Sequence, residues 1–138
     1  MTEAANSAWR WIDARLLVLL HDESLAEHGG ASGIRDAGLL DSALARPVNR
    51  AFYGGDPAPD MAELAAAYAH GLAKNHPFVD GNKRAAFLSV GLFLGLNGWR
   101  LKATQAEATL AVFALAGGDW DEAAFADWLR QHMVQRAA

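Results

Sequence analysis

The sequence predicts an all-α protein, a compact bundle of six helices with one buried helix at its centre. Two observations lead to this fold class. Apolar residues recur at helical spacing between breaks of glycine and proline, and no segment alternates apolar and polar residues as a half-buried strand does. At 138 residues the chain has the usual size of one domain, so we expect a single domain over residues 1–138.

The first expected helix is rich in leucine and runs from about Asp13 to Glu27. Gly29 and Gly30 follow it and favour a left-handed cap at its end. The leucines expected to face the core are Leu16, Leu17, Leu19 and Leu20. Two tryptophans precede the helix, and they either pack against it or form an aromatic surface for a partner: Trp9 and Trp11.

Asp36 and Pro47 bracket the second expected helix, because aspartate caps helix starts and proline breaks helix interiors. Residues 47–59 hold three prolines and two glycines. These residues disfavour a helix and predict a loop or a short hairpin flap, which carries Phe52 and Tyr53.

The third expected helix spans Asp60–Lys74, with its first residue as the cap. A fourth begins at about Gly81–Lys83 and stops at Asn97-Gly98. It is apolar on every side, which predicts that other helices enclose it at the centre of the bundle. Gly91 and Gly95 each weaken a helix by about 1 kcal/mol relative to alanine, so we expect them to admit a neighbouring helix at close range.

The fifth expected helix spans Thr104–Ala116, where a glutamate three residues after the threonine completes a capping box. A last helix starts at Asp119 or Asp121. Its apolar residues are Phe125, Trp128 and Leu129.

Composition disfavours several classes of function. Lysine and arginine number 12 against 16 acidic residues, a net charge of −4, which leaves no broad basic face for nucleic-acid phosphates. The absence of cysteine excludes disulfides, thiolate metal sites and cysteine nucleophiles. The beginning of the chain lacks the pattern of a signal peptide, and its longest apolar run is shorter than the roughly 18 residues of a membrane span. We therefore expect a cytoplasmic protein that binds neither nucleic acid nor membrane.

The stretch NHPFVDGNKRAAF, residues 75–87, places polar and charged side chains at the start of the fourth helix. Free backbone N–H groups and the helix dipole favour a bound anion at such a position. Lys83 and Arg84 add positive charge there. A phosphate-bearing ligand is therefore expected, although the chain has no P-loop sequence.

Each residue type in this stretch suits a step of phosphate chemistry. Histidine ionises near neutral pH, so His76 suits the removal of a proton from an attacking hydroxyl. Asp80 offers hard oxygen ligands for magnesium, and Gly81 lets the backbone approach a phosphate without a Cβ atom. Asn82 can donate or accept a hydrogen bond near the helix start, and Phe78 would anchor the loop in the core.

The nine residues HPFVDGNKR match the signature H-x-F-x-[D/E]-G-N-x-R of the Fic/Doc family at all seven specified positions. The blocks GGASGIRDAGLLDSALARP (29–47) and FLGLNGW (93–99) resemble the death-on-curing (Doc) branch of that family. The resemblance covers most of the chain. It implies a Fic/Doc-type helical fold, with the catalytic loop ahead of the central helix, and an enzyme that moves a phosphate-containing group from a nucleotide to a protein hydroxyl.

The resemblance implies a role for each motif residue. His76 would be the general base, Phe78 the loop anchor and Asp80 the magnesium ligand, while the phosphate cradle would consist of Gly81, Asn82, Lys83 and Arg84. Fic-like folds use a flap to align the target segment, which makes Phe52 and Tyr53 the implied residues for docking a target or partner. Their alternative role is to anchor the loop in the core.

Two departures from adenylylating relatives bear on the reaction. Lys83 stands where many of them have glycine, and Phe87 replaces the last arginine of their G-N-G-R-x-x-R pattern. In Doc-like proteins this lysine accompanies an ATP turned end for end, whose terminal phosphate faces the target. The resemblance therefore implies transfer of the γ-phosphate of ATP with Mg²⁺, and transfer of AMP is the alternative.

By resemblance, the chain is the toxin of a type II toxin–antitoxin pair. Its partners would be a cognate antitoxin, whose chain end covers the active-site groove, and a target protein. The target implied by the family is translation elongation factor Tu, whose modification would arrest translation and growth.

Other interpretations rest on single features. His21-Asp22 is the dipeptide of metal-dependent phosphohydrolases, but no histidine precedes it to complete their ligand set. His70 with Asp80 suggests a metal site, or His70 lies at the rim or in the core. A binding module without catalysis would have lost the base or the carboxylate, whereas His76 is present alongside Asp80. Arg35 either touches the nucleotide or catalytic loop or has no part in the site.

Overall fold

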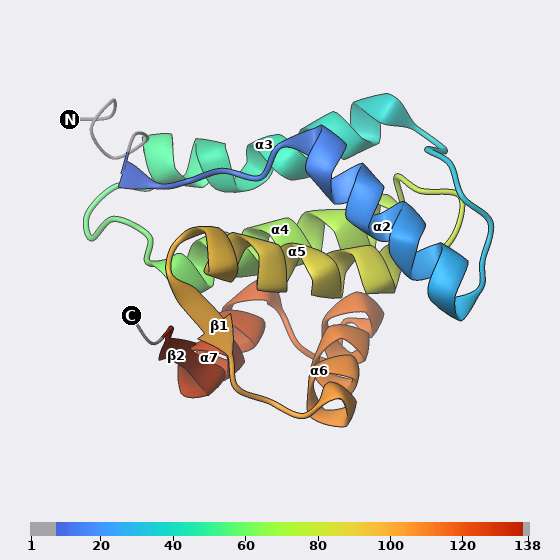
Figure 1. Ribbon diagram of the computed structural model, residues 1–138. Helices are drawn as coiled ribbons and strands as arrows, with labels where there is room; N and C mark the ends of the chain where they lie inside the picture. The colour runs from blue at the N-terminus through green and yellow to red at the C-terminus, as the bar shows by residue number, and fades with distance from the viewer. Residues whose placement is uncertain (1–7, 137–138) are drawn as a thin grey trace.

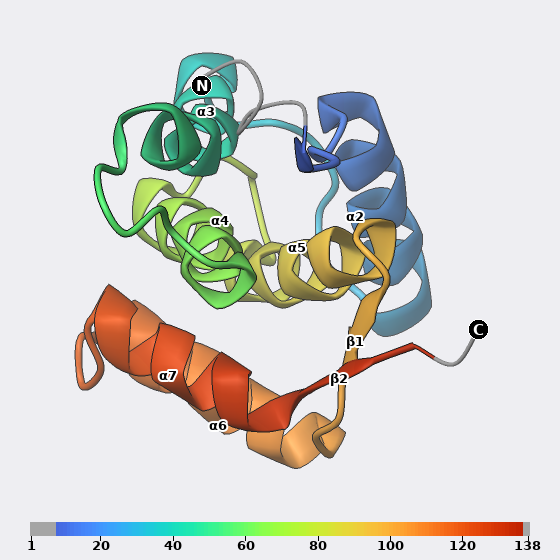
Figure 2. The same ribbon diagram turned by 90° about the vertical axis from the view of Figure 1, so that its left-hand side faces the viewer.

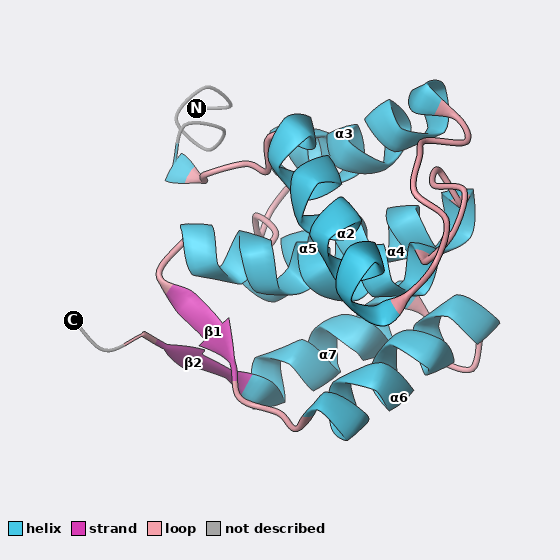
Figure 3. Ribbon diagram, turned by 45° about the vertical axis from the view of Figure 1, so that its right-hand side comes forward, coloured by secondary structure: helices cyan, strands magenta, loops and turns pink. Residues whose placement is uncertain are grey.

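Six helices and one short two-stranded sheet make up residues 8–136, the part of the chain that the computed structural model describes (Figures 1 and 3). The helices are α2 (Ala14–His28), α3 (Ala37–Tyr53), α4 (Met61–Asn75), α5 (Asn82–Leu96), α6 (Gln105–Gly117) and α7 (Glu122–His132). The strands β1 (Trp99–Leu101) and β2 (Met133–Gln135) pair antiparallel, with Arg100 opposite Val134. The predicted six-helix fold class is confirmed, while the two-stranded sheet was not predicted.

The helices lie in three layers, which Figure 2 shows most clearly. α2 and α3 form one outer layer, α4 and α5 the middle layer, and α6 and α7 the other outer layer. α4 is the most deeply buried helix, with an unbroken buried run from Leu64 to Ala69. The alanines of this run allow close packing on both sides of α4. The loop between α4 and α5 lies at one end of this middle layer (Figures 1 and 2).

The expected close contact at Gly91 and Gly95 is wrong. A Cβ atom at either position would meet no heavy atom within 4 Å, so neither glycine admits a neighbouring helix. Close packing occurs instead at Gly71 of α4, where a Cβ atom would lie 3.1 Å from the Cα atom of Ala43 on α3. The small residue that matters is therefore on α4, not on α5.

α3 continues through Pro47 to Tyr53, so the predicted break at Pro47 is wrong, and of the loop or flap predicted over residues 47–59 only residues 54–59 lie outside a helix. A proline inside a helix costs about 3 kcal/mol. Here the ring belongs to the buried stripe of α3, which consists of Leu40, Ala43, Pro47 and Ala51. Packing of this stripe against α4 offsets the lost hydrogen bond.

α2 turns fewer leucines inward than predicted. Its buried residues are Leu17, His21 and Leu25, one per helical turn. Leu16 and Leu19 are 36% and 56% exposed, because α2 lies in an outer layer and only one narrow face meets the core. Gly29 ends the helix with a positive φ of 93°, but its ψ of 158° lies outside the left-handed helical region. The two tryptophans that precede α2, Trp9 and Trp11, both contact the ring of Phe93 on α5.

Capping residues set the helix starts much as the sequence predicts. Asp60 with Glu63, and Thr104 with Glu107, form complete capping boxes. Asp121 rather than Asp119 caps α7. Each cap satisfies a backbone N–H that the first helical turn leaves without a partner.

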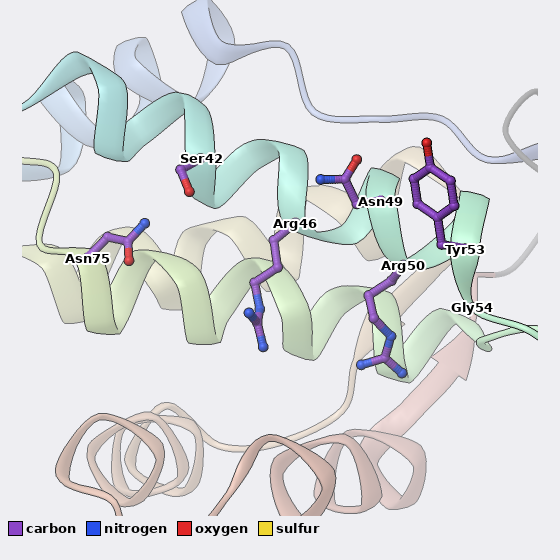
Figure 4. Close-up of a pocket in the computed structure, with 7 residues that line it drawn as sticks. All are labelled: Ser42, Arg46, Asn49, Arg50, Tyr53, Gly54 and Asn75. Atoms are coloured by element: carbon purple, nitrogen blue, oxygen red, sulfur yellow. The ribbon is translucent and has the colours of Figure 1, made fainter.

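A hollow of about 470 Å³ runs along α3, lined by Ser42, Arg46, Asn49, Arg50, Tyr53, Gly54 and Asn75 (Figure 4). The side chains of Arg46 and Arg50 extend from α3 across α4 toward α7. Both pair with Glu122 of α7, and Arg50 also pairs with Glu63 at 2.8 Å. Because these carboxylates pair with the arginines, we interpret the hollow as a region of ion pairs between α3, α4 and α7 and not as an anion site.

No helix within residues 8–136 combines the length and the apolar character that crossing a bilayer requires.

Candidate active site

The motif residues His76–Gly81 form the loop that joins α4 to α5, and the rest of the motif begins α5. Two residues with positive φ turn this loop: His76 (φ 50°), which ends α4, and Gly81 (φ 72°), which precedes α5. The loop borders a pocket of about 450 Å³. Its lining includes the predicted residues His76, Asp80, Gly81, Asn82, Lys83 and Arg84, and also Phe87 of α5 and four residues of α6. The structure therefore brings together every residue predicted for the base, the metal ligand and the phosphate cradle.

His76 adopts the left-handed backbone conformation, which costs a non-glycine residue about 1–2 kcal/mol. Arg35 holds it in place. The Nε atom of Arg35 donates to the carbonyl oxygen of His76 at 2.7 Å, and its Nη2 atom donates to that of Asn75 at 2.9 Å. The guanidinium thus satisfies two carbonyl groups at the end of α4, while the imidazole is left at the edge of the pocket. Of the two interpretations of Arg35, the structure supports contact with the catalytic loop.

Residues 33–36 are hydrogen-bonded to residues 77–79 of the catalytic loop. The backbone N–H of Arg35 donates to the carbonyl oxygen of Pro77 at 2.7 Å, and that of Val79 donates to Gly33 at 3.0 Å. Ile34 and Phe78 form an isolated antiparallel bridge. These contacts join the segment that precedes α3 to the catalytic loop.

Phe52 and Tyr53, predicted to dock a target or partner, lie on the last turn of α3, and Tyr53 is 82% exposed. The opposite end of α3 lies near the catalytic loop, because the side chain of Asn75 donates to the carbonyl oxygen of Leu39 at 3.0 Å. The fourteen-residue separation from Leu39 to Tyr53 corresponds to about 21 Å along a helix. The structure therefore places this aromatic pair away from His76.

Phe78 is buried and anchors the loop in the core, in line with its predicted position. Its ring lies 4.3 Å from the ring of His21, measured between centroids. Asn82 closes the loop from the other side, because its amide accepts from the N–H of Phe78 at 2.9 Å and donates to its carbonyl oxygen at 3.1 Å. The Asn82 side chain is therefore engaged within the loop, and its contribution to a phosphate cradle is to fix the backbone.

The carboxylate of Asp80 faces the pocket and is held by two backbone N–H groups. One oxygen accepts from Gly81 at 2.8 Å and the other from Ala31 at 3.3 Å. Residues 8–136 contain no cluster of three or more metal-ligating side chains. A lone carboxylate beside an anion site fits magnesium, which is usually bound by one or two carboxylates together with nucleotide phosphates.

The start of α5 has no capping side chain. Its first N–H groups therefore remain available to an anion, as expected for a phosphate-binding helix start. Lys83 lies with its Nζ atom 5.3 Å from the ring centre of Phe113 on α6, and Arg84 donates to the hydroxyl of Ser24 on α2 at 3.3 Å. Both cations line the pocket, so its helix-start side is positively charged.

Sequence reasoning missed two parts of the site. His21 is fully buried behind the loop, and its Nε2 atom lies 2.9 Å from the carbonyl oxygen of Asp80. The wall formed by α6 contributes Gln105, Thr109, Val112 and Phe113. A histidine on the apolar face of a helix was the available signal for His21, whereas nothing local marks the α6 residues. His70 lies elsewhere, with its Nδ1 atom 4.0 Å from Glu122 of α7, and burial lowers its pKa despite that carboxylate.

These features describe a helical protein in which a loop that carries a histidine and a carboxylate leads into the uncapped start of a helix. The Fic/DOC family model matches residues 11–94, more than half of the chain, and the chain belongs to this family. The family resemblance predicted from the sequence is confirmed.

Two relatives carry more specific names. The chain is 34% identical over 122 residues to "Protein kinase doc" of Escherichia phage P1, a match that covers 88% of this chain and 94% of the relative. It is 48% identical over 75 residues to "Toxin Doc" of Mycolicibacterium smegmatis, covering 54% of this chain and 57% of that protein.

Proposed function

We propose that this protein is a Doc-like toxin that transfers the γ-phosphate of ATP to a hydroxyl group of a target protein. The observation that carries the proposal is the position of His76 and Asp80 in one pocket with the uncapped start of α5. The similarity to a protein kinase along 88% of the chain supports the same activity. Family membership supports a phosphate-containing group as the one transferred.

Each side chain has a distinct part in this reaction. His76 accepts the proton of the target hydroxyl as the oxygen attacks the γ-phosphorus, a contribution worth about 10²- to 10⁴-fold in rate for a general base. The N–H groups at the start of α5 and the charge of Lys83 stabilise the negative charge on the phosphoryl oxygens. Asp80 would hold Mg²⁺, which when bound neutralises charge on the nucleotide phosphates. The bond from the γ-phosphorus to the bridging oxygen breaks, and ADP leaves.

Lys83 and Phe87 favour phosphate transfer over AMP transfer. Lys83 fills space at the helix start that a glycine would leave open and adds a positive charge near a terminal phosphate. Phe87 lines the same pocket and cannot clamp a phosphate as an arginine does. Both changes remove support for the pose in which the α-phosphate faces His76.

Isotopic labelling of ATP tests this proposal. The protein, Mg²⁺ and the target are incubated with ATP labelled at the α- or at the γ-phosphate, and the mass of the target is measured. We expect label from the γ-position and a gain of about 80 Da. Label from the α-position, with a gain of about 329 Da, would identify an AMP transferase instead. No label from either position would identify a binding module without catalysis.

The partners follow from the family and from the name of the mycobacterial relative. A toxin of this type requires an antitoxin, which we propose covers the pocket beside His76 and prevents nucleotide or target binding. We propose elongation factor Tu as the target and the cytoplasm as the site of action. Mass spectrometry of translation factors from cells that express the protein, compared with the His76→Ala variant, tests the target.

A further inference from the structure

The pocket beside the catalytic loop is divided into a polar and an apolar side. Charged and polar motif residues line the side at the start of α5. The other side is formed by Phe87 of α5 and by Val112 and Phe113 of α6. A nucleotide has the same division, with a charged triphosphate at one end and a flat, largely apolar base at the other.

We propose that the α6 side of this pocket is a nucleobase subsite, in which the ring of Phe113 stacks on the base. This inference rests on the proposed function and specifies how the nucleotide lies in the site. Phe113 is 53% exposed, although it is a large aromatic residue. A stacked base would cover apolar surface of this ring that otherwise faces solvent.

The contact of Lys83 shows how the Phe113 ring is oriented. The Nζ atom of Lys83 lies over the ring, 5.3 Å from its centre, and both residues line the pocket. A face of the ring is therefore directed toward the pocket rather than away from it. When a triphosphate draws the ammonium group toward its oxygens, that face becomes available to a base.

The subsite offers stacking but little base-specific hydrogen bonding. The polar side chains of α6 that line it are Gln105 and Thr109, both exposed. An amide and a hydroxyl can each donate or accept, so they adapt to either purine. Stacking discriminates little between bases, because every base has a π face. We therefore expect the site to bind ATP and GTP with similar affinity.

This placement also bears on which phosphate meets His76. With the base against Phe113 and the triphosphate along the start of α5, the end of the nucleotide remote from the base points to the catalytic loop. The terminal phosphate is then the group next to the target hydroxyl, in agreement with phosphate transfer.

Binding titrations separate the base from the phosphates. Titration calorimetry with Mg²⁺ compares ATP, GTP and inorganic triphosphate on the wild type and on the Phe113→Ala, Phe113→Tyr and Leu110→Ala variants. Leu110 is the matched control, because it lies on α6, is 69% exposed and does not line the pocket. We expect Phe113→Ala to weaken ATP and GTP binding about 5- to 100-fold and to leave triphosphate binding unchanged. Phe113→Tyr and Leu110→Ala should bind as the wild type does.

Three results would overturn the subsite. They are unchanged ATP binding by Phe113→Ala, an equal loss of ATP and triphosphate binding, and a wild type that binds GTP more than about tenfold more weakly than ATP. The labelling experiment tests the proposed function independently. If the wild type transfers γ-label but Phe113→Ala binds ATP as the wild type does, the proposed subsite is wrong and the proposed kinase activity is supported. Transfer of α-label would exclude the proposed kinase activity, while the titrations would still show whether Phe113 contacts the base.

Discussion

The Nε2 atom of His21 lies 2.9 Å from the carbonyl oxygen of Asp80 and joins α2 to the catalytic loop. A carbonyl oxygen only accepts hydrogen bonds, so Nε2 carries the proton and donates. The other ring nitrogen, Nδ1, is buried without a hydrogen-bond partner among residues 8–136. A Cβ atom at Gly81 would lie 2.9 Å from Cε1 of the same ring, which explains the need for glycine there. His21 therefore sets the position of the backbone that carries the Asp80 carboxylate.

We predict that His21 acts on nucleotide binding through this hydrogen bond. His21→Leu removes the donor to the Asp80 carbonyl group, and the loss of this hydrogen bond costs about 0.5–1.5 kcal/mol of folding stability. Loss of a group that orients a metal ligand typically weakens metal binding about 10- to 100-fold. His21→Gln retains an N–H donor of similar reach and should recover much of the affinity for Mg·ATP, measured by titration calorimetry. An equal loss of Mg·ATP affinity in the two variants would show that packing of the His21 ring, and not its hydrogen bond, supports nucleotide binding.

His76→Ala should fold normally and lose transfer activity. The imidazole lies at the pocket edge, so its removal disturbs no core packing. Loss of a general base lowers the rate about 10²- to 10⁴-fold. Asparagine tolerates the left-handed backbone better than alanine does, so His76→Asn is the variant that keeps the loop conformation. Circular dichroism and turnover are compared for both, and a folded variant with undiminished transfer would remove His76 from the proposed role.

The parts of the molecule that the sequence predicted are those set by local chemistry. The capping residues Asp60, Thr104 and Asp121 each accept from an N–H group in the first turn of their own helix. The local sequence is therefore sufficient to predict where these helices begin. The motif residues were also found together, because a loop of six residues cannot separate them widely. Its glycine and histidine turn the chain within the loop itself.

The parts that were missed depend on contacts between distant segments. Pro47 remains in a helix because it is buried and its helix packs against α4, and helix propensity alone does not contain that information. The β1 and β2 strands are only three residues long and pair across more than thirty residues of chain. Phe113 reaches the pocket only because α6 packs beside α5. Tertiary packing decides each of these features.

Asp80→Asn should change the magnesium dependence of transfer without unfolding the protein. The amide keeps one oxygen that can accept from Gly81 or Ala31, but it loses the negative charge that attracts a divalent cation. We expect the magnesium concentration for half-maximal rate to rise at least about tenfold. Asp22→Asn is a suitable control, since Asp22 is exposed on α2 and does not line this pocket. Identical magnesium curves for the wild type and Asp80→Asn would exclude Asp80 as the ligand.

The carboxylate of Asp60 has two roles that substitution can separate. It caps α4 by accepting from the N–H of Glu63 at 2.9 Å, and it pairs with Arg130 of α7 at 2.7 Å. Partial burial would raise the pKa of Asp60, but the hydrogen bonds from Arg130 and the backbone of Glu63 outweigh it and lower the pKa below its usual value. Asp60→Asn keeps a capping oxygen and loses the ion pair, whereas Asp60→Ala loses both.

The lowered pKa of Asp60 fixes the sign of its pH dependence. Its charge contributes stability above the unfolded-state pKa of about 3.9, and that contribution is lost as the pH falls through the lower folded-state value. At neutral pH we expect Asp60→Asn to lower the free energy of unfolding by no more than about 1 kcal/mol, as for a partly exposed pair. Asp60→Ala should cost about 1 kcal/mol more because the cap is lost. Urea unfolding from neutral pH down to acid measures both, and the gap between wild type and Asp60→Asn should close below about pH 4. A gap of constant size throughout would show that the charge of Asp60 contributes nothing to stability.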